Sequence, residues 1–410
     1  MKVLSLGGAG DMGKMAVAAL LSSPRVSGVT IADKSYELAQ RYIQLAGSYK
    51  VSAVEIDITD ENKLRTLIAS HDLVVNTIGP FYKFGVPVLK AAIQAKKNYV
   101  DICDDWKPTL EMLQMSEAAK AAGITAIIGI GASPGMTNLL AVLACAELDD
   151  VDEVTTAWGF GNTKMGKKLP FFISKKKLIK KENKKEDRKA SAALLHLVYE
   201  AIGKVPTFQD GKLTEIEALK EAEPLVFPGG GRPMYACHIG HPEPVTLSRT
   251  LKAKNISNQM FLTKRLTTEL RNYIGQIEKG QMTAEEVAIA IEDVLNSLWA
   301  KFYILWTVLK RFFKFPPMLI ALAKGLKNNQ KMRVATGIKY QPYGEIDEGM
   351  DGLTAVPMVV AAEMLLDGKV LKKGVLTPEE SLDPEEFFSR YAKYCRSDFT
   401  FKDVVIKKIW

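Results

Sequence analysis

Short apolar runs alternate with helical periodicity over the first 130 residues of the 410-residue chain. Six runs are rich in β-branched residues and have the length of buried strands, and the segments between them have the spacing of helices. The runs are KVLSLG, GVTIAD, VSAVEID, DLVVNTIG, NYVDIC and ITAIIGIG. This alternation predicts an α/β fold in which residues 1–135 form a doubly wound parallel sheet of the Rossmann type.

The pattern changes beyond residue 130. Helical patterns cover residues 133–148, 258–278, 283–297 and 351–367. The first of these helices is expected to have Ser133 as its cap and Pro134 in its first turn. Between 205 and 250, short strand-like runs are broken by glycine and proline. We therefore expect a second, α+β domain with a mixed or antiparallel sheet over residues 136–350, followed by a C-terminal segment, 351–410.

The first predicted strand runs directly into a glycine-rich turn, GGAGDMG. Gly8, Gly10 and Gly13 have the GxGxxG spacing that lets a backbone approach a pyrophosphate at the start of a helix. Twenty positions later the second strand ends in Asp33, where a carboxylate can accept the ribose hydroxyls of a dinucleotide. A carboxylate repels a 2′-phosphate, so Asp33 favours NAD, while Lys34 beside it leaves NADP open.

The carboxyl ends of parallel strands meet at one edge of a sheet, and ligands bind at that edge. Residues that end the later strands are therefore expected beside the glycine turn. The expected cofactor contacts are Gly8, Ala9, Gly10, Asp11, Met12, Gly13, Asp33, Lys34, Asp57, Ile58, Asn76, Thr77, Gly79, Pro80, Phe81 and Asp101. The alternative is a glycine turn that serves the fold alone.

A hydride-transfer enzyme must manage one proton, since the cofactor supplies the reactive carbon. Asp101 ends the fifth strand, where a carboxylate can bind an ammonium group or shuttle a proton. Arg232 and His241 lie in a glycine-rich stretch of the second domain. Arg232 is a candidate clamp for a substrate carboxylate, and His241 a candidate acid or base. Asp104 and Asp105 could act as site carboxylates in the same way, and they are at least as well interpreted as caps of the next helix.

The charge is concentrated in one segment. Residues 164–189 contain twelve basic and three acidic residues, so this segment has a net charge of +9. The whole chain has a net charge of +8, so the remaining residues sum to −1. We expect no nucleic-acid partner, because no aromatic residues are interleaved as in nucleic-acid-binding modules. The four cysteines lie far apart and have no metal-ligand spacing, which indicates a reducing cytoplasm and no metal site.

Residues 298–326 combine an apolar run with crowded aromatic residues, four cations and a Pro-Pro pair. Too many charges interrupt the run for a transmembrane span. One interpretation is a segment that lies on a membrane surface, supported by the cations of 164–189. The other is a lid or a subunit interface.

Four stretches resemble the saccharopine dehydrogenase family. They are GGAGDMG at 7–13, NTIGPFYKFGVPVLKAAIQAKKNYVDIC at 76–103, GIGASPGMTNLLA at 129–141 and LKKGVLTPEESLDPEEFF at 371–388. The resemblance implies a Rossmann domain to which the chain returns at its C-terminus and a central domain on a mixed sheet. It also implies pyridine-nucleotide redox chemistry at a carbon–nitrogen bond, and a homodimer. The VDICDDW stretch, the lysine-rich segment and the aromatic segment depart from the family pattern and leave the substrate open.

The leading hypothesis is an NAD(P)-dependent oxidoreductase that acts on an imine, an amine or a related carbonyl of a small molecule. A second hypothesis is an oxidoreductase that takes a lipidic or aromatic substrate at a membrane surface. A third is a sensor that binds NAD(P) without catalysis.

Overall fold

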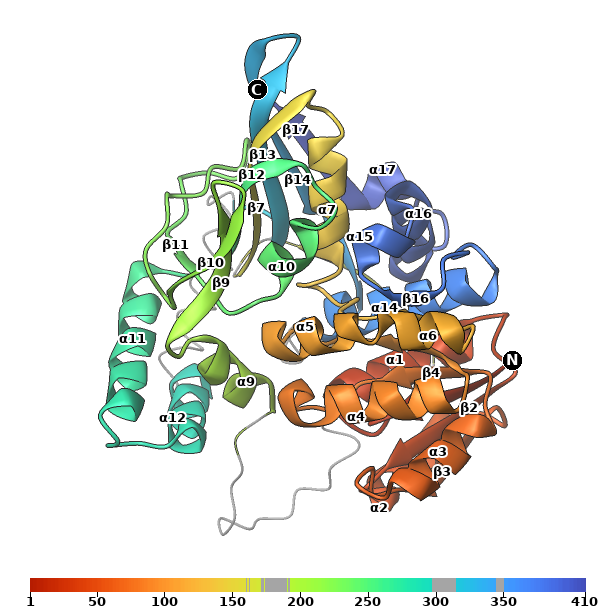
Figure 1. Cartoon of the computed structure of the whole chain (residues 1–410). Helices are drawn as coiled ribbons and strands as arrows, with labels where there is room; N and C mark the ends of the chain where they lie inside the picture. Colours follow the sequence, from red (N-terminus) through yellow and green to blue (C-terminus); the bar gives the residue numbers. More distant parts are fainter. Residues whose placement is uncertain are drawn as a thin grey trace.

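The computed structural model describes residues 1–159, 161, 163–170, 173, 190, 192–296, 315–343 and 350–410. Two main β-sheets organise the chain, with the N-terminal sheet in the lower half of Figure 1 and the second sheet in the upper half.

The N-terminal sheet has seven parallel strands in the order β16-β6-β5-β4-β1-β2-β3. They are β1 (Lys2–Leu6), β2 (Gly28–Asp33), β3 (Val51–Glu55), β4 (Leu73–Asn76), β5 (Asn98–Asp101), β6 (Thr125–Ile127) and β16 (Gly374–Leu376). The order reverses at β1, because the chain passes from β3 to β4 on the opposite side of β1. This is the predicted doubly wound Rossmann sheet. The C-terminal segment completes it, since β16 pairs with β6.

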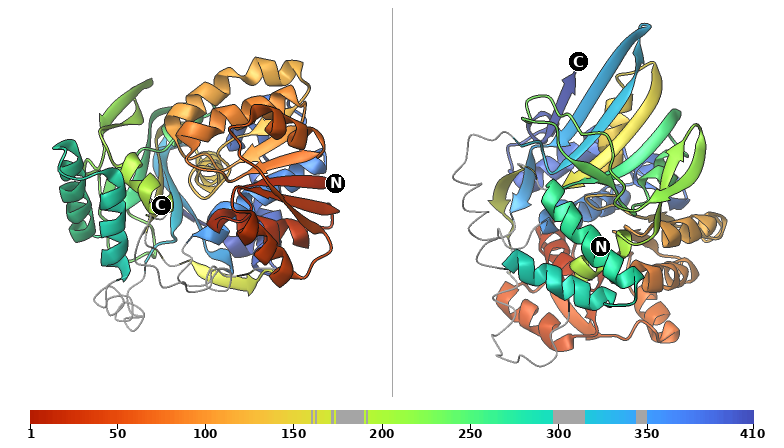
Figure 2. Two further views of the ribbon diagram at one scale, coloured as in Figure 1. Left: turned by 90° about the horizontal axis from the view of Figure 1, so that it is seen from below. Right: turned by 90° about the vertical axis from the view of Figure 1, so that its left-hand side faces the viewer.

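Helices cover both faces of this sheet. One face carries α1 (Asp11–Ser22), α2 (Tyr36–Ala46) and α14 (Asp351–Leu366), and the other carries α3 (Glu61–Ala69), α4 (Phe81–Gln94), α5 (Trp106–Gln114) and α6 (Ser116–Ala121). Helix α14 packs along α1 and reaches β4 and β5. Nearly all its side chains are buried, as expected for a helix enclosed between layers. The left view of Figure 2 shows these layers from below.

The second sheet is mixed, as predicted. Its order is β10-β9-β12-β7-β13-β14-β17, with β11 paired to β12. The strands are β7 (Asp150–Gly159), β9 (Lys204–Gln209), β10 (Lys212–Glu217), β11 (Ala236–His238), β12 (Ala253–Phe261), β13 (Leu319–Lys327), β14 (Gln330–Ile338) and β17 (Val405–Ile409). Strands β7 and β12 run parallel, and the other pairs are antiparallel. A small parallel pair joins β8 (Lys164–Lys168) to β15 (Tyr340–Tyr343).

Helices of the second half connect the two sheets. Helix α7 (Met136–Cys145) packs on β7, β13 and β14, and α10 (Glu243–Leu247) contacts β9, β12 and α5. Helix α9 (Ala192–Glu200) packs against α12 (Ala284–Asn296), which contacts α11 (Lys264–Glu278). The C-terminal segment adds α15 (Pro378–Ser381), α16 (Pro384–Cys395) and α17 (Phe401–Val404). The contact of α5 with α10 brings the end of the N-terminal sheet against the second half of the chain.

Three sequence expectations need correction. Residues 258–261 belong to strand β12 and not to a helix, because they pair with β7 and their side chains are buried in the sheet. Residues 319–326 form the largely buried strand β13, so this part of the aromatic segment lies inside the fold and is not available to a membrane. The last residues of the C-terminal segment leave the Rossmann sheet and pair with β14 as strand β17. Residues 171–172, 174–189 and 297–314 of the basic and aromatic segments lie outside the described residues.

Candidate functional site at the carboxyl edge of the parallel sheet

The glycine turn lies between the end of β1 and the start of α1. Gly7 has a φ of 74°, in the left-handed region that glycine adopts without strain. A Cβ atom on Gly13 would lie 2.0 Å from the carbonyl oxygen of Gly7, so only glycine lets α1 approach β1 this closely. A Cβ atom on the exposed Gly10 would meet only that same oxygen within 4 Å, at 3.3 Å. The open side of the turn at Gly10 therefore fits the close approach of a pyrophosphate.

Asp33 ends β2 beside this turn, where the sequence predicts a ribose-binding acid. Its Oδ2 accepts a hydrogen bond from the Ala9 amide (3.2 Å), and its Oδ1 accepts one from the Ser35 amide (2.9 Å). The exposed Lys34 points its Nζ to Asp57, 3.4 Å from Oδ2. A hydrogen bond from the side chain of Thr59, one residue beyond Ile58, lowers the pKa of Asp57 to about 2. Two carboxylates and one ammonium group thus line the edge expected to hold the adenosine ribose.

The end of β4 lies next to the glycine turn. Thr77 donates a hydrogen bond from Oγ1 to the last carbonyl of β1 (2.9 Å). Asn76 accepts one from the amide two residues on (3.0 Å) and donates one to the Tyr99 hydroxyl (2.9 Å). The Gly79–Pro80 peptide bond is cis, and α4 begins directly after it at the buried Phe81. The fold thus brings the predicted residues of this turn to the nucleotide edge.

Asp101 is completely buried at the end of β5. Its Oδ1 accepts hydrogen bonds from the amides of Gly129 (2.7 Å) and Cys103 (3.0 Å), and its Oδ2 accepts one from the Tyr99 hydroxyl (2.8 Å). Burial raises the pKa of Asp101 to about 6. Both oxygens are engaged by the protein, so the structure gives Asp101 a role in positioning the loops after β5 and β6, in place of the expected contact with substrate.

His241 is buried where the second half of the chain meets the carboxyl edge of the parallel sheet. Its Nε2 lies 2.9 Å from Oε1 of Glu200, and its Nδ1 lies 3.3 Å from Oγ of Ser133 and 3.5 Å from Oε2 of Glu243. The ring contacts that of Trp158, with centroids 5.3 Å apart. Burial alone would lower the pKa of His241, but the carboxylates of Glu200 and Glu243 raise it well above its usual value. The two carboxylates thus favour the protonated form of this buried imidazole.

Glu243 begins α10 and has no exposed surface. Its Oε1 accepts hydrogen bonds from the Ser133 hydroxyl, from Oγ1 of Thr137 (2.9 Å) and from Nδ2 of Asn258 (2.8 Å). The donors come from the β6–α7 connection, from the first turn of α7 and from β12, so this carboxylate joins the two halves of the chain. The predicted cap role of Ser133 is wrong, because Gly135 stands at the N-cap of α7 and the Ser133 hydroxyl is turned to Glu243.

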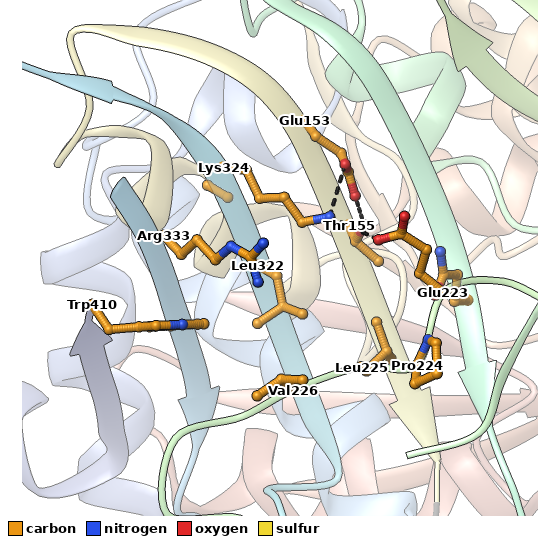
Figure 3. A pocket seen from close by; sticks show the side chains of 12 residues that line it. Glu153, Thr155, Glu223, Pro224, Leu225, Val226, Leu322, Lys324, Arg333 and Trp410 are labelled. Atoms are coloured by element: carbon orange, nitrogen blue, oxygen red, sulfur yellow. Dashed lines mark hydrogen bonds and ion pairs between the residues drawn. The ribbon is translucent and has the colours of Figure 1, made fainter. Parts of the chain in front are cut away.

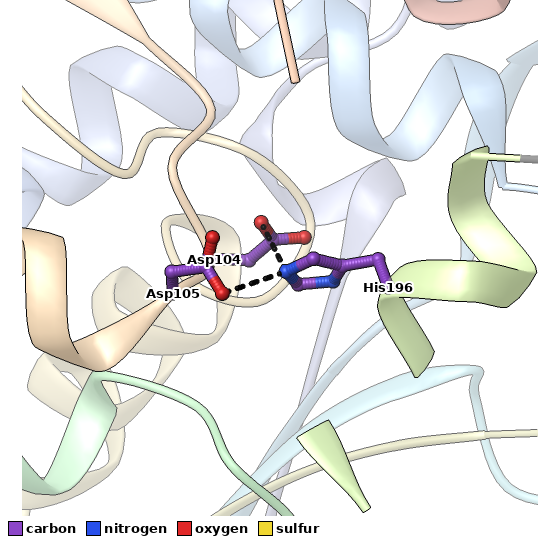
Figure 4. A group of neighbouring side chains, drawn as sticks. All are labelled: Asp104, Asp105 and His196. Carbon is purple, nitrogen blue, oxygen red and sulfur yellow. Dashed lines mark hydrogen bonds and ion pairs between the residues drawn. The ribbon is translucent and has the colours of Figure 1, made fainter. Parts of the chain in front are cut away.

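A second histidine, His196 on α9, lies between acids of both halves. Its Nε2 is 3.0 Å from Oδ1 of Asp105 and 3.4 Å from Oδ1 of Asp104 (Figure 4). Its Nδ1 is 3.4 Å from Oε1 of Glu200. Asp105 does not cap α5 with its side chain, and its Oδ2 instead accepts a hydrogen bond from the Tyr82 amide in the first turn of α4 (2.9 Å). Asp104, Asp105 and His196 offer ligand atoms within 4.8 Å of one another, and their contacts are ion pairs between imidazole and carboxylate.

The sequence reasoning missed three members of this cluster, His196, Glu200 and Glu243. A usable signal was the i, i+4 spacing of His196 and Glu200, which puts two titratable groups on one face of an otherwise apolar helix. Arg232, the third predicted catalytic residue, lies exposed in the loop before β11. Among the described residues, no contact joins Arg232 to the histidines or to their carboxylates.

A separate hollow lies on the second sheet. Strands β7, β13 and β14 line it together with the segment 223–226 and Trp410, and Lys324 bridges Glu153 and Glu223 there at 2.9 and 3.2 Å (Figure 3). None of the predicted site residues belongs to its lining. We therefore assign the chemistry to the carboxyl edge of the parallel sheet.

The glycine turn, the acid after β2 and the doubly wound sheet together define a dinucleotide-binding domain. Residues 3–127 match the family model of the saccharopine dehydrogenase NADP binding domain. The family resemblance predicted from the sequence is thus confirmed for this domain, and so is its assignment to an NAD(P) cofactor.

Curated relatives match over part of this chain. An NADP(+), L-glutamate-forming saccharopine dehydrogenase of Pyricularia oryzae is 33% identical over 120 residues, which cover 29% of this chain and 25% of the relative. A lipid droplet localized protein of Caenorhabditis elegans is 27% identical over 139 residues, 32% of each chain. The chain thus spans about a quarter to a third of the length of these relatives.

The whole fold has a counterpart among solved structures. Apo saccharopine dehydrogenase (L-Glu forming) from Saccharomyces cerevisiae aligns with a TM-score of 0.65 over 100% of this chain and 99% of that chain. The sequences are 16% identical over the aligned residues, so the similarity establishes a shared architecture.

Proposed function

We propose that this protein is an NAD(P)-dependent oxidoreductase that transfers hydride at a carbon–nitrogen bond, or at a related carbonyl, of a small molecule. One observation supports this above the others. The buried His241, between the carboxylates of Glu200 and Glu243, lies against the β6–α7 connection, at the same sheet edge as the glycine turn. A group of the kind that donates and accepts protons thus stands on the edge at which a dinucleotide binds.

The residues of the glycine turn fit the diphosphate, since Gly10 leaves room for it and the start of α1 faces it. Asp33 is our candidate for the adenosine ribose, and residues 76–81 for the nicotinamide half. The bound cofactor supplies the hydride. The protein must then supply one proton to the nitrogen or oxygen of the reduced substrate, and we assign that proton to His241. Arg232 remains a candidate partner for a substrate carboxylate.

The test combines calorimetry with turnover. We expect the purified chain to bind NADH or NADPH, and to consume it in the presence of at least one class among cyclic imines, keto acids with amines, aldehydes and ketones. The oxidative direction uses secondary amines and amino acids with NAD(P)⁺. Absence of nucleotide binding would overturn the proposal. Tight binding without turnover across the panel would favour the sensor hypothesis.

Asp33 is expected to set the preference between the two nucleotides. Replacing it in Asp33→Asn removes a negative charge near the expected 2′ position, and the amide oxygen can still accept one of the two backbone hydrogen bonds. We expect the ratio of Kd for NADPH to Kd for NADH to fall by roughly tenfold, about 1.4 kcal/mol.

Asp60→Asn is the matched control for this change. Asp60 is an exposed N-cap that accepts a hydrogen bond from the Lys63 amide, and asparagine caps equally well. Calorimetric titration of both nucleotides should show no change in their ratio for the control. An unchanged ratio for Asp33→Asn would remove Asp33 from the ribose site.

A membrane-surface oxidoreductase is the second candidate. One relative is a lipid droplet localized protein, and this chain carries the basic 164–189 and aromatic 298–314 sequences. Among the described residues, no helix is both long and apolar enough to cross a bilayer. We expect flotation with phosphatidylserine liposomes at low salt and its loss at high salt, since exposed charges are screened. Lack of flotation at low salt would exclude this candidate.

We further propose a cytoplasmic homodimer, as the family resemblance implies. Sedimentation velocity should give twice the mass of the single chain, and a single-chain mass at micromolar concentration would refute the dimer.

A further inference from the structure

Ion pairs connect the buried junction of the two halves to the protein surface. We infer that His241, Glu200, His196 and the Asp104–Asp105 pair form a proton-transfer chain, which rests on the proposed oxidoreductase function and specifies how its proton is delivered. The chain is made from side chains of α9, of the loop after β5 and of the segment before α10.

The central link is one carboxylate oxygen shared by two imidazoles. Oε1 of Glu200 lies 2.9 Å from Nε2 of His241 and 3.4 Å from Nδ1 of His196. The opposite nitrogen of His196 lies 3.0 Å from Asp105. An imidazole can accept a proton on one nitrogen and release one from the other. Glu200 Oε1 accepts no hydrogen bond from either ring as they stand, so transfer through this carboxylate requires its side chain or an imidazole ring to turn.

Exposure rises along the chain. The side chains of His241 and Glu200 are each 5% exposed, those of His196 and Asp105 are 15% and 14% exposed, and that of Asp104 is 34% exposed. The inner end contacts Ser133 at the carboxyl edge of the parallel sheet, and the outer end meets solvent at Asp104. This gradient is the arrangement needed to refill a buried proton donor from water while the donor itself stays shielded.

The neighbouring side chains that the structure describes do not compete with the two histidines for these carboxylates. Within the described part of the chain, no lysine or arginine forms an ion pair with Asp104, Asp105, Glu200 or Glu243. Burial and the nearby carboxylates raise the pKa of the Cys103 thiol, so it stays neutral.

The other neighbours are a carboxylate and two phenols. Glu243 faces His241 from α10, 3.5 Å from its Nδ1. Tyr82 and Tyr199 pack edge to face beside Asp105, with ring centroids 5.7 Å apart. Burial raises the pKa of Tyr82, which keeps this phenol neutral. The two histidines therefore carry the mobile positive charge.

The proton balance follows from hydride transfer. Reduction of an imine, R₂C=NR′, by NAD(P)H takes one hydride at carbon and one proton at nitrogen, and yields R₂CH–NHR′ and NAD(P)⁺. A carbonyl takes the same proton at oxygen. His241 releases that proton from one ring nitrogen. A turn of the ring then presents the bare nitrogen to Glu200, which passes on a proton from His196, and His196 is reprotonated from water through Asp104 and Asp105. In the reverse reaction, oxidation of the amine or alcohol, the proton moves in the opposite direction, from His241 to the solvent.

The first test needs no substrate. The protein has only four histidines, and the titration of their imidazole nitrogens can be followed by NMR. We expect Glu200→Gln to move the titrations of both His196 and His241 to lower pH by at least one unit, since both lose the same carboxylate. His238→Gln is the matched control. His238 lies on β11 and is not one of the proton-transfer residues, so its replacement should leave the pKa values of His196 and His241 unchanged. A shift in only one histidine, or in neither, would overturn the shared link.

The second test uses any substrate that the panel finds. We expect His196→Gln to lower kcat at least tenfold with little change in KM, and 4-methylimidazole at tens of millimolar to restore much of it. A structural role of His196 would not be rescued by the small base, and an unchanged kcat would refute the chain. If wild-type protein turns over no substrate, the proposed activity fails, while the NMR test still decides whether one proton system links the two histidines.

Discussion

Replacing Gly13 by alanine is expected to abolish nucleotide binding. A Cβ atom at this position would lie 2.0 Å from the Gly7 carbonyl oxygen and 2.6 Å from Cα of Gly8. Both are backbone atoms, so the turn itself must move, and the helix N-terminus loses its aim at the diphosphate. We expect affinity for NAD(P)H to fall at least about 100-fold, roughly 2.7 kcal/mol or more, measured by calorimetry. The thermal midpoint should also fall.

Gly275→Ala is the control for this change. Gly275 lies inside α11, and a Cβ atom there would meet nothing within 4 Å. Alanine is favoured over glycine in a helix by up to ~1 kcal/mol, so this variant should be as stable as the wild type or more stable, with unchanged nucleotide affinity. Normal binding by Gly13→Ala would show that the turn does not hold the cofactor.

Glu243→Ala is expected to cause the largest loss of stability. The change removes the carboxylate that accepts from the buried Thr137 and Asn258 and from the half-buried Ser133, and it takes one carboxylate away from His241. The Asn258 amide keeps a second acceptor, the Thr156 hydroxyl. Removing one partner from a buried, charged network costs about 3–5 kcal/mol. We expect the thermal midpoint to drop by at least about 5 °C, or the protein to fail to accumulate in folded form.

Two further variants identify the cause of that loss. Glu215→Ala removes an exposed glutamate on β10 and should change stability by less than ~0.5 kcal/mol. Glu243→Gln keeps an acceptor oxygen without the charge, so it should retain part of the lost stability. Equal melting of Glu243→Ala and Glu215→Ala would mean that Glu243 does not join the two halves of the chain.

Much of the N-terminal half could be predicted, because its signals are local. The glycine spacing, the acid after the second strand and the strand–helix alternation each lie within a few tens of residues. The cap interpretations of Ser133 and Asp105 failed for the opposite reason. A serine or aspartate before a helix is usually a cap. Here the Ser133 hydroxyl instead meets Glu243, 110 positions away, and Asp105 meets His196, 91 positions away.

Strand β13 is a second feature that the sequence alone could not predict. Its apolar residues follow an aromatic run, so the sequence left a membrane-surface segment and a lid or subunit interface open, and it did not predict a strand. Pairing with β7 and β14 satisfies its backbone and buries its side chains, and that pairing depends on residues 150–159 and 330–338, far away along the chain. Strand β17 is similar, since it crosses from one sheet to the other only because β14 offers a free edge.

Residue order alone was enough to establish the Rossmann sheet, the nucleotide turn and the kinship of that domain, since short-range spacing dictates each of them. Tertiary packing alone decided which acids surround which imidazoles. Four carboxylates and two histidines, from the loop after β5, from α9 and from the segment around the start of α10, meet where the two halves of the chain pack, and burial of most of them couples their charges. No local pattern encodes such a meeting, because it depends on how two sheets pack against one another.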